Sequence, residues 1–249
     1  SKWRQARQIS YQIVLVEDGW DEPVSLGWLK TQELYPADNP PIVLVHERNQ
    51  GFTRAINTGI IYALARLGEW PFMVLLNNDT EVQTGWLGAL SDTVTLGKNV
   101  GVVGAKLLSM TDPDQILHGG TLDLLGTHKG GRESERHCKK RTDEVWVTGA
   151  CMAITREAVL HCGLFDQGYE NFCSDSDYCL TVKSRGYRVV YQPECRVYHI
   201  QNATVSGKVD ASRLMRDQQR LLDKWGGKML QDWIKELPLG LSRGQGPGR

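Results

Sequence analysis

The chain has 249 residues, of which 41% are hydrophobic and 23% are charged, so it can bury a sizeable core and is not disordered as a whole. Its 29 basic residues balance 29 acidic ones, which excludes the overall positive charge typical of proteins that bind nucleic acid or anionic membranes. No segment is long and apolar enough for a transmembrane helix, and the six scattered cysteines indicate reduced thiols. We therefore expect a cytoplasmic protein, at most peripherally attached to a membrane, with no nucleic-acid partner.

Three short, continuous apolar runs predict strands that are buried on both faces: Tyr11–Glu17, Ile42–His46 and Phe72–Asn77. Between them, Val24–Leu34 and Phe52–Leu67 have apolar residues at helical spacing. This alternation of strands and helices predicts an α/β fold with a doubly wound, mostly parallel sheet.

Polar residues follow each of the three predicted strands. The clusters are Glu17-Asp18-Gly19, Glu47-Arg48-Asn49 and Asn77-Asn78-Asp79. Ligands of doubly wound sheets bind beyond the carboxyl ends of the strands, so the clusters predict a ligand site at one edge. For the third cluster, a strand-to-helix turn capped by Asp79 or Thr80 is the structural alternative.

The rest of the chain predicts further elements and a change of organisation near residue 205. We expect a main domain over residues 1–205 and a helical extension with a flexible tail over 206–249. Ser174 is expected to cap a helix that ends at Gly186, with Asp177 completing a capping box. The other expected elements are a helix over Gly85–Leu96, a strand over Val100–Leu108, a hairpin and mobile loop within His118–Lys140, a strand over Val145–Ile154, two short strands in VVYQ and CRVYH, and helices over Ser212–Trp225 and Met229–Lys235.

Six motifs, in order along residues 5–205, closely resemble glycosyltransferase family 2, the inverting enzymes of GT-A fold, and in particular its rhamnosyltransferase-like members. The motifs are LVEDG, NQGFTRAINTGI, LLNNDTEV followed by GWL, VTGACMAITREAV, FDQGYENFCSDSDYCLTVKSRGY and VYHIQNAT. The resemblance implies a GT-A sheet with a small antiparallel part. It also implies transfer of a sugar, with inversion, from a UDP-, GDP- or dTDP-linked nucleotide-diphospho-sugar to a hydroxyl of a saccharide, lipid-linked or protein acceptor.

The resemblance further implies a divalent cation, Mn²⁺ or Mg²⁺, bound by Asp79 at the last position of a DxD-like motif. Such hard cations take oxygen ligands and retain waters, so one carboxylate together with phosphate oxygens can suffice. His199 is the implied second metal ligand, because VYH followed by Thr204 resembles the family's closing element. A histidine with a surface or core role is the alternative.

Residues of the implied donor site come from all three polar clusters and one helix. Glu17 matches the family's acidic residue that contacts the nucleobase, with Asp18 beside it, and Asn77 and Asn78 precede the metal ligand. Arg54 lies in the first turn of a predicted helix, where its guanidinium suits a diphosphate. The alternatives are a solvated turn for Glu17 and Asp18 and a surface ion pair for Arg54.

Asp175 is the catalytic base that the resemblance implies. It would take the proton of the acceptor hydroxyl, and a helix N-terminus favours its ionised form. Complementing the helix dipole alone is the alternative for Asp175 and Asp177. Acceptor or sugar contacts are expected from Trp146, Thr148, Gly149 and Asp177, although a large aromatic such as Trp146 is more often a core residue.

The chain departs from the family pattern in two places. It opens inside what would be the first helix, so the family's first central strand has no counterpart, and Ser174 stands where Glu is commoner. Because an inner strand missing from a sheet would leave unpaired edges, we expect another segment to fill that place. The departures keep open a non-catalytic sugar-nucleotide-binding or scaffold module of the same fold. A nucleotidyltransferase is a third hypothesis, which leaves the helix of Asp175 unexplained.

Overall fold

A computed structural model of the chain describes residues 9–19, 39–96, 98–121, 128–133, 136–170, 172–200 and 211–236, with the backbone alone for 96, 136–137 and 228–236. The predicted helix over Val24–Leu34, the segment with Thr204 and the predicted tail after residue 236 lie outside the described residues.

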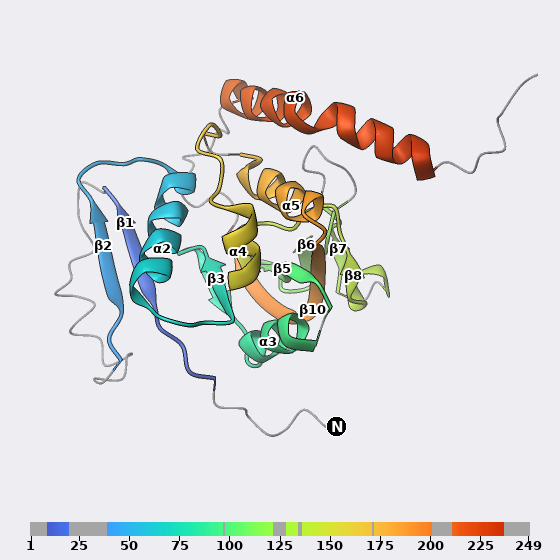
Figure 1. The fold of residues 1–249 in the computed structure, drawn as a ribbon. Helices are drawn as coiled ribbons and strands as arrows, with labels where there is room; N and C mark the ends of the chain where they lie inside the picture. Colours follow the sequence, from blue (N-terminus) through green and yellow to red (C-terminus); the bar gives the residue numbers. More distant parts are fainter. Residues whose placement is uncertain are drawn as a thin grey trace, which may run out of the picture.

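Strands β1 (Val14–Asp18) and β2 (Ile42–His46) pair in parallel as a two-stranded sheet, which confirms two predicted strands. Helix α2 (Phe52–Arg66) packs on β1, and its Gly59 lies so close that an added β-carbon would meet a Val16 methyl at 3.5 Å. Within the described ranges neither β1 nor β3 (Phe72–Leu76) has a strand partner on its other edge. Figure 1 shows the β1–β2 pair beside the main sheet.

The main sheet is mixed, as an α/β fold with an antiparallel part requires. Strands β3, β5 and β10 point the same way, whereas β9 lies between β3 and β5 in the opposite direction and β4 runs antiparallel at the far edge. The order along the sheet is β3, β9 (Cys151–Thr155), β5 (Val100–Ser109), β10 (Arg188–His199) and β4 (Thr80–Val82).

Short strands extend this sheet and form the predicted hairpin region. β6 (Gln115–His118) pairs with β5, β7 (Gly131–Arg132) pairs with β6, and β8 (Thr142–Asp143) pairs with β10. A 3₁₀ turn covers Arg136–Lys139.

Helices cover both faces of the main sheet. β5 is buried at every position, because its neighbouring residues Val102 and Val103 belong to hydrophobic clusters on opposite sides. One cluster involves residues of α2, α4 (Arg156–Cys162) and α5 (Ser174–Ser184), and the other involves α3 (Trp86–Leu96). Helix α6 (Ala211–Glu236) crosses the end of the molecule above α5 (Figure 1).

Four local predictions need correction. The strand expected from Val145 begins only at Cys151, because a turn at residues 149–150 precedes it. Ser174 is not the N-cap: Cys173 holds that position with φ 61°, no side chain caps the helix, and no capping box forms. The two helices expected after residue 212 are one helix, because Gly226 and Gly227 remain helical at a cost of about 1 kcal/mol each.

The fourth correction concerns β10, which is one strand where two were expected. Between Gln192 and Arg196 it advances four residues while β5 advances only from Ala105 to Lys106, so a wide bulge interrupts the ladder. The stop at Gly186 is confirmed, with φ +87° just after the helix.

Candidate functional site

The loops after β1 and β2 meet at the start of α2. The Asp18 carboxylate accepts hydrogen bonds from the backbone amides of Gln50 (2.9 Å) and Gly51 (2.7 Å), and it lies 2.6 Å from His46 Nδ1. Gly19 has φ +64°, and a β-carbon there would lie 2.0 Å from the Arg48 carbonyl carbon, so only glycine permits this contact. The predicted convergence of these two polar clusters is confirmed.

Asp18 therefore has an anchoring role, because its oxygens hold the loop that enters α2. Glu17, by contrast, has no side-chain hydrogen bond to any described residue. Arg54 is exposed in the first turn of α2, and no described carboxylate pairs with it. The exposed guanidinium lies beside a helix N-terminus, whose first amides lack acceptors within the helix, so this end of α2 favours an anion.

Asp79 and His199 form a facing pair at the edge of the main sheet. Asp79 Oδ1 and His199 Nε2 are 3.2 Å apart, and both side chains are 14% exposed. Both atoms are buried, and neither has a hydrogen bond of good geometry to a described residue. Buried polar atoms are rarely left unsatisfied, so the pair has the character of a ligand site.

The separation of these two atoms fits a divalent cation. In an octahedral shell with bonds of about 2.1 Å, neighbouring donor atoms lie about 3.0 Å apart. A carboxylate and an imidazole suit Mn²⁺ in particular. The described residues contain no group of three or more His, Cys, Asp or Glu side chains able to hold a metal, so Asp79 and His199 are the two candidate ligands among them.

The β4–β10 ladder positions this pair. His199 lies opposite Thr80, and the Ile200 amide donates to the Asp79 carbonyl oxygen at 3.0 Å. The Thr80 hydroxyl donates to the Asn77 carbonyl oxygen at 2.6 Å and closes the turn. Because strand β4 follows, and not a helix, the alternative of a helix cap at Asp79 or Thr80 is wrong.

Asp175 lies in the first turn of α5 and is partly exposed. Its Oδ2 accepts a hydrogen bond from the Gly149 amide at 2.9 Å, and its Oδ1 accepts one from the Ser176 amide at 2.8 Å. A β-carbon at Gly149 would lie 3.3 Å from the Phe52 ring and 3.5 Å from Asp175 Cβ. Asp175, Gly149 and the start of α2 therefore meet at one place, with Thr148 next to them along the chain.

A single rung of the sheet joins the Asp79 segment to Asp175. The Asn77 amide donates to the Ala150 carbonyl oxygen at 3.0 Å, and Leu76 pairs with Cys151. Ala150 directly follows Gly149, whose amide binds Asp175. The side chains of Asn77 and Asn78 have no hydrogen bonds to described residues. The structure thus connects the predicted metal ligand, the predicted base and Gly149 through residues 149–151.

Comparison with known proteins identifies the family. The model of "Glycosyltransferase like family 2" matches residues 5–218. The chain belongs to this family.

Two curated proteins are similar to this chain in sequence. The protein y4gI of Sinorhizobium fredii, described as uncharacterized, is 29% identical over 209 residues, which are 78% of this chain and 22% of that protein. An N-acetylglucosaminyl-diphospho-decaprenol L-rhamnosyltransferase of Mycobacterium tuberculosis is 24% identical over 193 residues, which are 67% of this chain and 60% of that enzyme. The chain thus spans less than two thirds of the length of either relative.

Solved structures confirm the GT-A fold. The structure of GalNAc-T7 with UDP, GalNAc and Mn²⁺ has a TM-score of 0.65 at 18% identity and covers 86% of this chain and 42% of that one. The mannosyltransferase PcManGT of Pyrobaculum calidifontis, in complex with GDP-Man and Mn²⁺, has a TM-score of 0.52 at 15% identity, with coverage of 95% and 56%. None of the described helices is long and apolar enough to cross a membrane.

Two predicted site residues, Trp146 and Asp177, do not belong to the group formed by Asp175, Gly149 and the start of α2. Trp146 is 2% exposed and belongs to the core, where its ring lies 5.8 Å from His118 and 5.1 Å from His128. Asp177 is also 2% exposed, and its carboxylate binds Tyr169, Lys224 and Trp225. The observed protein contacts of Trp146 and Asp177 are typical of structural residues. Their roles as acceptor or sugar contacts stay predictions.

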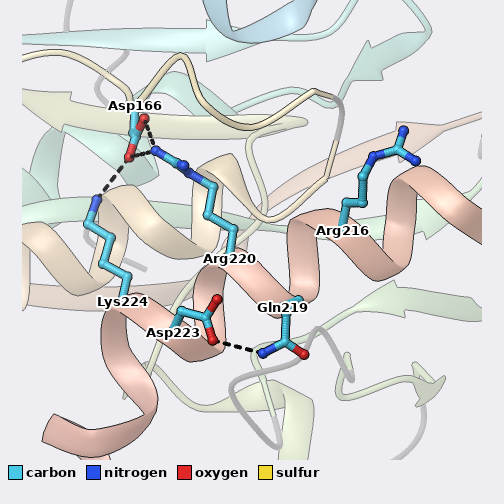
Figure 2. Close-up of a pocket in the computed structure, with 6 residues that line it drawn as sticks. All are labelled: Asp166, Arg216, Gln219, Arg220, Asp223 and Lys224. Atoms are coloured by element: carbon cyan, nitrogen blue, oxygen red, sulfur yellow. Dashed lines mark hydrogen bonds and ion pairs between the residues drawn. The ribbon is translucent and has the colours of Figure 1, made fainter.

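Sequence reasoning missed the contacts of α6. The helix carries Arg216, Arg220 and Lys224 at four-residue spacing, which is the signal for a basic stripe. In Figure 2, Arg220 and Lys224 reach Asp166 across a pocket that these residues line together with Gln219 and Asp223. Burial acts to raise the pKa of Asp166, but the Gly168 amide and the two basic side chains outweigh it and lower this pKa.

Proposed function

We propose that this glycosyltransferase transfers a sugar, with inversion, from a nucleotide-diphospho-sugar to an acceptor hydroxyl. The observation that carries the proposal is the connection of two chemically distinct groups through residues 149–151. The Asp79–His199 pair offers a cation site, and Asp175 offers a carboxylate at a helix N-terminus. An inverting transfer needs both: stabilisation of the leaving diphosphate and a base for the acceptor.

The proposed donor-binding residues rest on the chemistry of their side chains and on the ligands of two similar structures. Two structural neighbours hold UDP or GDP-Man together with Mn²⁺. In this chain Asp79 and His199 would hold Mn²⁺ or Mg²⁺, which when bound neutralises charge on the departing diphosphate. Arg54, in the first turn of α2, would bind phosphate oxygens, while Glu17 would contact the nucleobase and Asp18 would hold the loop beside it.

On the acceptor side, Asp175 would receive the proton of the attacking hydroxyl. The acceptor oxygen forms the new bond to the anomeric carbon, the bond from that carbon to the diphosphate oxygen breaks, and the proton passes to Asp175. The Gly149 amide at 2.9 Å and the Ser176 amide at 2.8 Å each bind one oxygen of the carboxylate, and together they fix its orientation.

A lipid-linked saccharide is the acceptor class that the curated relative favours. The name of this Mycobacterium tuberculosis enzyme describes rhamnosyl transfer to N-acetylglucosaminyl-diphospho-decaprenol. Such an acceptor would require at least peripheral contact with a membrane. Saccharide and protein acceptors are the other classes to include in a test.

The test measures donor binding and turnover separately. Wild type and Asp175→Asn are titrated with UDP-, GDP- and dTDP-sugars in the presence of Mn²⁺, and nucleotide release is followed with lipid-linked and free saccharide acceptors. Asparagine can still accept the Gly149 hydrogen bond through its one oxygen, but it loses the bond to the Ser176 amide and cannot take a proton. We therefore expect donor affinity to persist while kcat falls by about 10² to 10⁴. Asp143→Asn, an exposed carboxylate paired with Arg188, is the matched control and should retain kcat.

The alternative is a module that binds sugar nucleotides without transferring them. The unpaired edges of β1 and β3 among the described residues favour it, because they separate Glu17 and Asp18 from the main sheet. Donor binding without release of nucleotide, under every acceptor condition, would support this alternative and overturn the proposal of catalysis. Full transfer by Asp175→Asn would overturn the assignment of the base alone.

A further inference from the structure

Helix α6 fastens the segment that leads into α5. Residues 166–170, 172 and 173 lie outside helices and strands before α5, and two acidic side chains of this segment, Asp166 and Glu170, bind basic side chains of α6. Asp166 pairs with Arg220 at 3.0 Å and with Lys224 at 3.2 Å, and Glu170 pairs with Arg216 at 3.1 Å. These pairs are partly exposed and salt can screen them, so each contributes little alone.

The buried contact between the two elements is Asp217. Asp217 is only 2% exposed. Its two carboxylate oxygens accept hydrogen bonds from the Glu170 amide (3.1 Å) and the Phe172 amide (2.8 Å). Charge-assisted hydrogen bonds to backbone amides are stronger than neutral ones. A carboxylate that is buried and bonded through both oxygens fixes the path of the chain immediately before α5.

The segment that Asp217 holds is under backbone strain. Cys173, the N-cap of α5, is a non-glycine residue at φ 61°, a left-handed conformation that costs about 1 kcal/mol. The Asp177 amide donates to the Cys173 carbonyl oxygen at 2.8 Å, so this turn sets the first turn of the helix. Asp175 lies in that first turn, two residues after the strained position.

The same segment touches the donor side of the site. A β-carbon at Gly51, the N-cap of α2, would lie 3.6 Å from the Glu170 carbonyl oxygen. Asp217 therefore binds the amide of a residue whose carbonyl group faces the start of α2. Within α5, the buried Asp177 binds Lys224 and Trp225 of α6 at 2.9 Å and 2.7 Å, which adds a second point of attachment.

We propose that Asp217 is a positioning residue for Asp175, and that α6 acts as a strap that holds the strained turn at Cys173 in the geometry that transfer requires. This proposal rests on the proposed function, because it assumes that Asp175 is the base. Asp217 acts through the amides of Glu170 and Phe172 and touches no reacting group.

The test compares Asp217→Asn with Asp223→Asn. Asparagine at 217 keeps the side-chain shape but can accept only one of the two amide hydrogen bonds, since its NH₂ group would oppose the other N–H. Asp223 lies on the same helix and lines the pocket of Figure 2. Among the described residues its carboxylate accepts a hydrogen bond from Gln219 alone, at 2.8 Å. The substitution Asp223→Asn removes the same charge from α6 but breaks no hydrogen bond to the segment before α5.

We expect Asp217→Asn to lower kcat while the dissociation constant of the donor stays almost unchanged. A shift of the base by about 1 Å can cost up to about 100-fold, so kcat of Asp217→Asn should fall between about 10-fold and 100-fold. The dissociation constant of the donor with Mn²⁺ should stay within about twofold, because neither part of the proposed donor site depends on α6. The β4–β10 ladder holds the Asp79–His199 pair, and the Asp18 carboxylate holds the amides of Gln50 and Gly51 at the start of α2. Asp223→Asn should match wild type in both, and amide hydrogen exchange at 170–175 should rise in Asp217→Asn alone.

A second substitution tests the cause of the loss. Glycine adopts the left-handed conformation without the cost borne by cysteine, so Cys173→Gly in the Asp217→Asn background should restore part of kcat. If circular dichroism shows that Asp217→Asn does not fold, Arg220→Gln replaces it, with a smaller loss of kcat expected in the same direction.

Each outcome decides between the proposals. Wild-type kcat in a folded Asp217→Asn, or an equal loss in Asp223→Asn, overturns the positioning role while the proposed function stands. A parallel loss of donor affinity also overturns it. If wild type turns over no donor, the proposed function fails, and the positioning of a base fails with it.

Discussion

Asp79 and His199 face one another across the β4–β10 ladder, with Oδ1 and Nε2 3.2 Å apart and each atom buried without a well-formed hydrogen bond to a described residue. A buried carboxylate oxygen that lacks a hydrogen bond is stabilised when a cation binds to it.

Asp79→Asn and His199→Gln should each weaken Mn²⁺ binding in the presence of nucleotide by about tenfold or more, because each removes one of two protein ligands. Isothermal titration with Mn²⁺ and UDP or GDP measures the effect. Thermal stability without metal should change little, since no well-formed hydrogen bond is lost. Unaltered Mn²⁺ affinity in both variants would show that the cation binds elsewhere.

Gly149→Ala should lower kcat with a small effect on folding. The new methyl group would lie 3.3 Å from the Phe52 ring and 3.5 Å from Asp175 Cβ, so the base or the ring must move. Phe52→Leu combined with Gly149→Ala should recover part of the activity. Gly88→Ala in α3 is the control, because a β-carbon there meets no atom within 4 Å and alanine favours a helix. Equal kcat for Gly149→Ala and Gly88→Ala would contradict the close approach.

Arg54→Ala should raise the dissociation constant of the nucleotide diphosphate without lowering the melting temperature. Arg54 is exposed in the first turn of α2 and pairs with no described carboxylate, so its charge is available for phosphate. Arg66→Ala, at the exposed last turn of the same helix, removes an equal charge far from the site. Fluorescence titration with a labelled nucleotide distinguishes them; a similar loss of affinity in both would indicate a general charge effect.

His118 should make stability depend on pH. Burial, followed by the charges of His128 and Lys129, holds the pKa of His118 well below 6.5. Below pH 6.5 the unfolded chain takes up a proton that the folded chain refuses, so stability is lost as the pH falls, by up to about 1.4 kcal/mol for each pH unit. Thermal unfolding at pH 7.5, 6.5 and 5.5 measures this slope, and His118→Gln should flatten it. Identical slopes in the two proteins would rule out His118 as the cause.

Much of the fold could be predicted from local patterns, because continuous apolar runs and helical spacing are properties of neighbouring residues. The strands at Ile42–His46 and Val100–Ser109 are confirmed on that basis. Asp79 and His199 came from the family resemblance, and the structure places them together. Their roles, like that of Asp175, stay predictions.

The contacts that escaped prediction join residues far apart in the chain. The hydrogen bonds between Asp217 and the amides of Glu170 and Phe172 span 47 and 45 residues, and a single sequence holds no signal for such a pair. Similarly, LVEDG does not reveal that the Asp18 oxygens are taken by Gln50 and Gly51. The N-cap at Cys173 could not be foreseen, because tertiary contacts override the local preference for serine there.

The bulge in β10 determines where His199 lies along the sheet, and so whether it can face Asp79. It takes up three more residues on β10 than on β5, and three residues of regular strand would span about 10 Å. Without it, His199 would run past the end of β5 and could not lie level with Thr80. Because side chains alternate between faces, removing one bulge residue would also turn His199 to the opposite side of the sheet. The length of an irregular segment around Pro193 and Glu194, well before the histidine in the chain, is therefore as much a determinant of the proposed metal ligand set as the histidine itself.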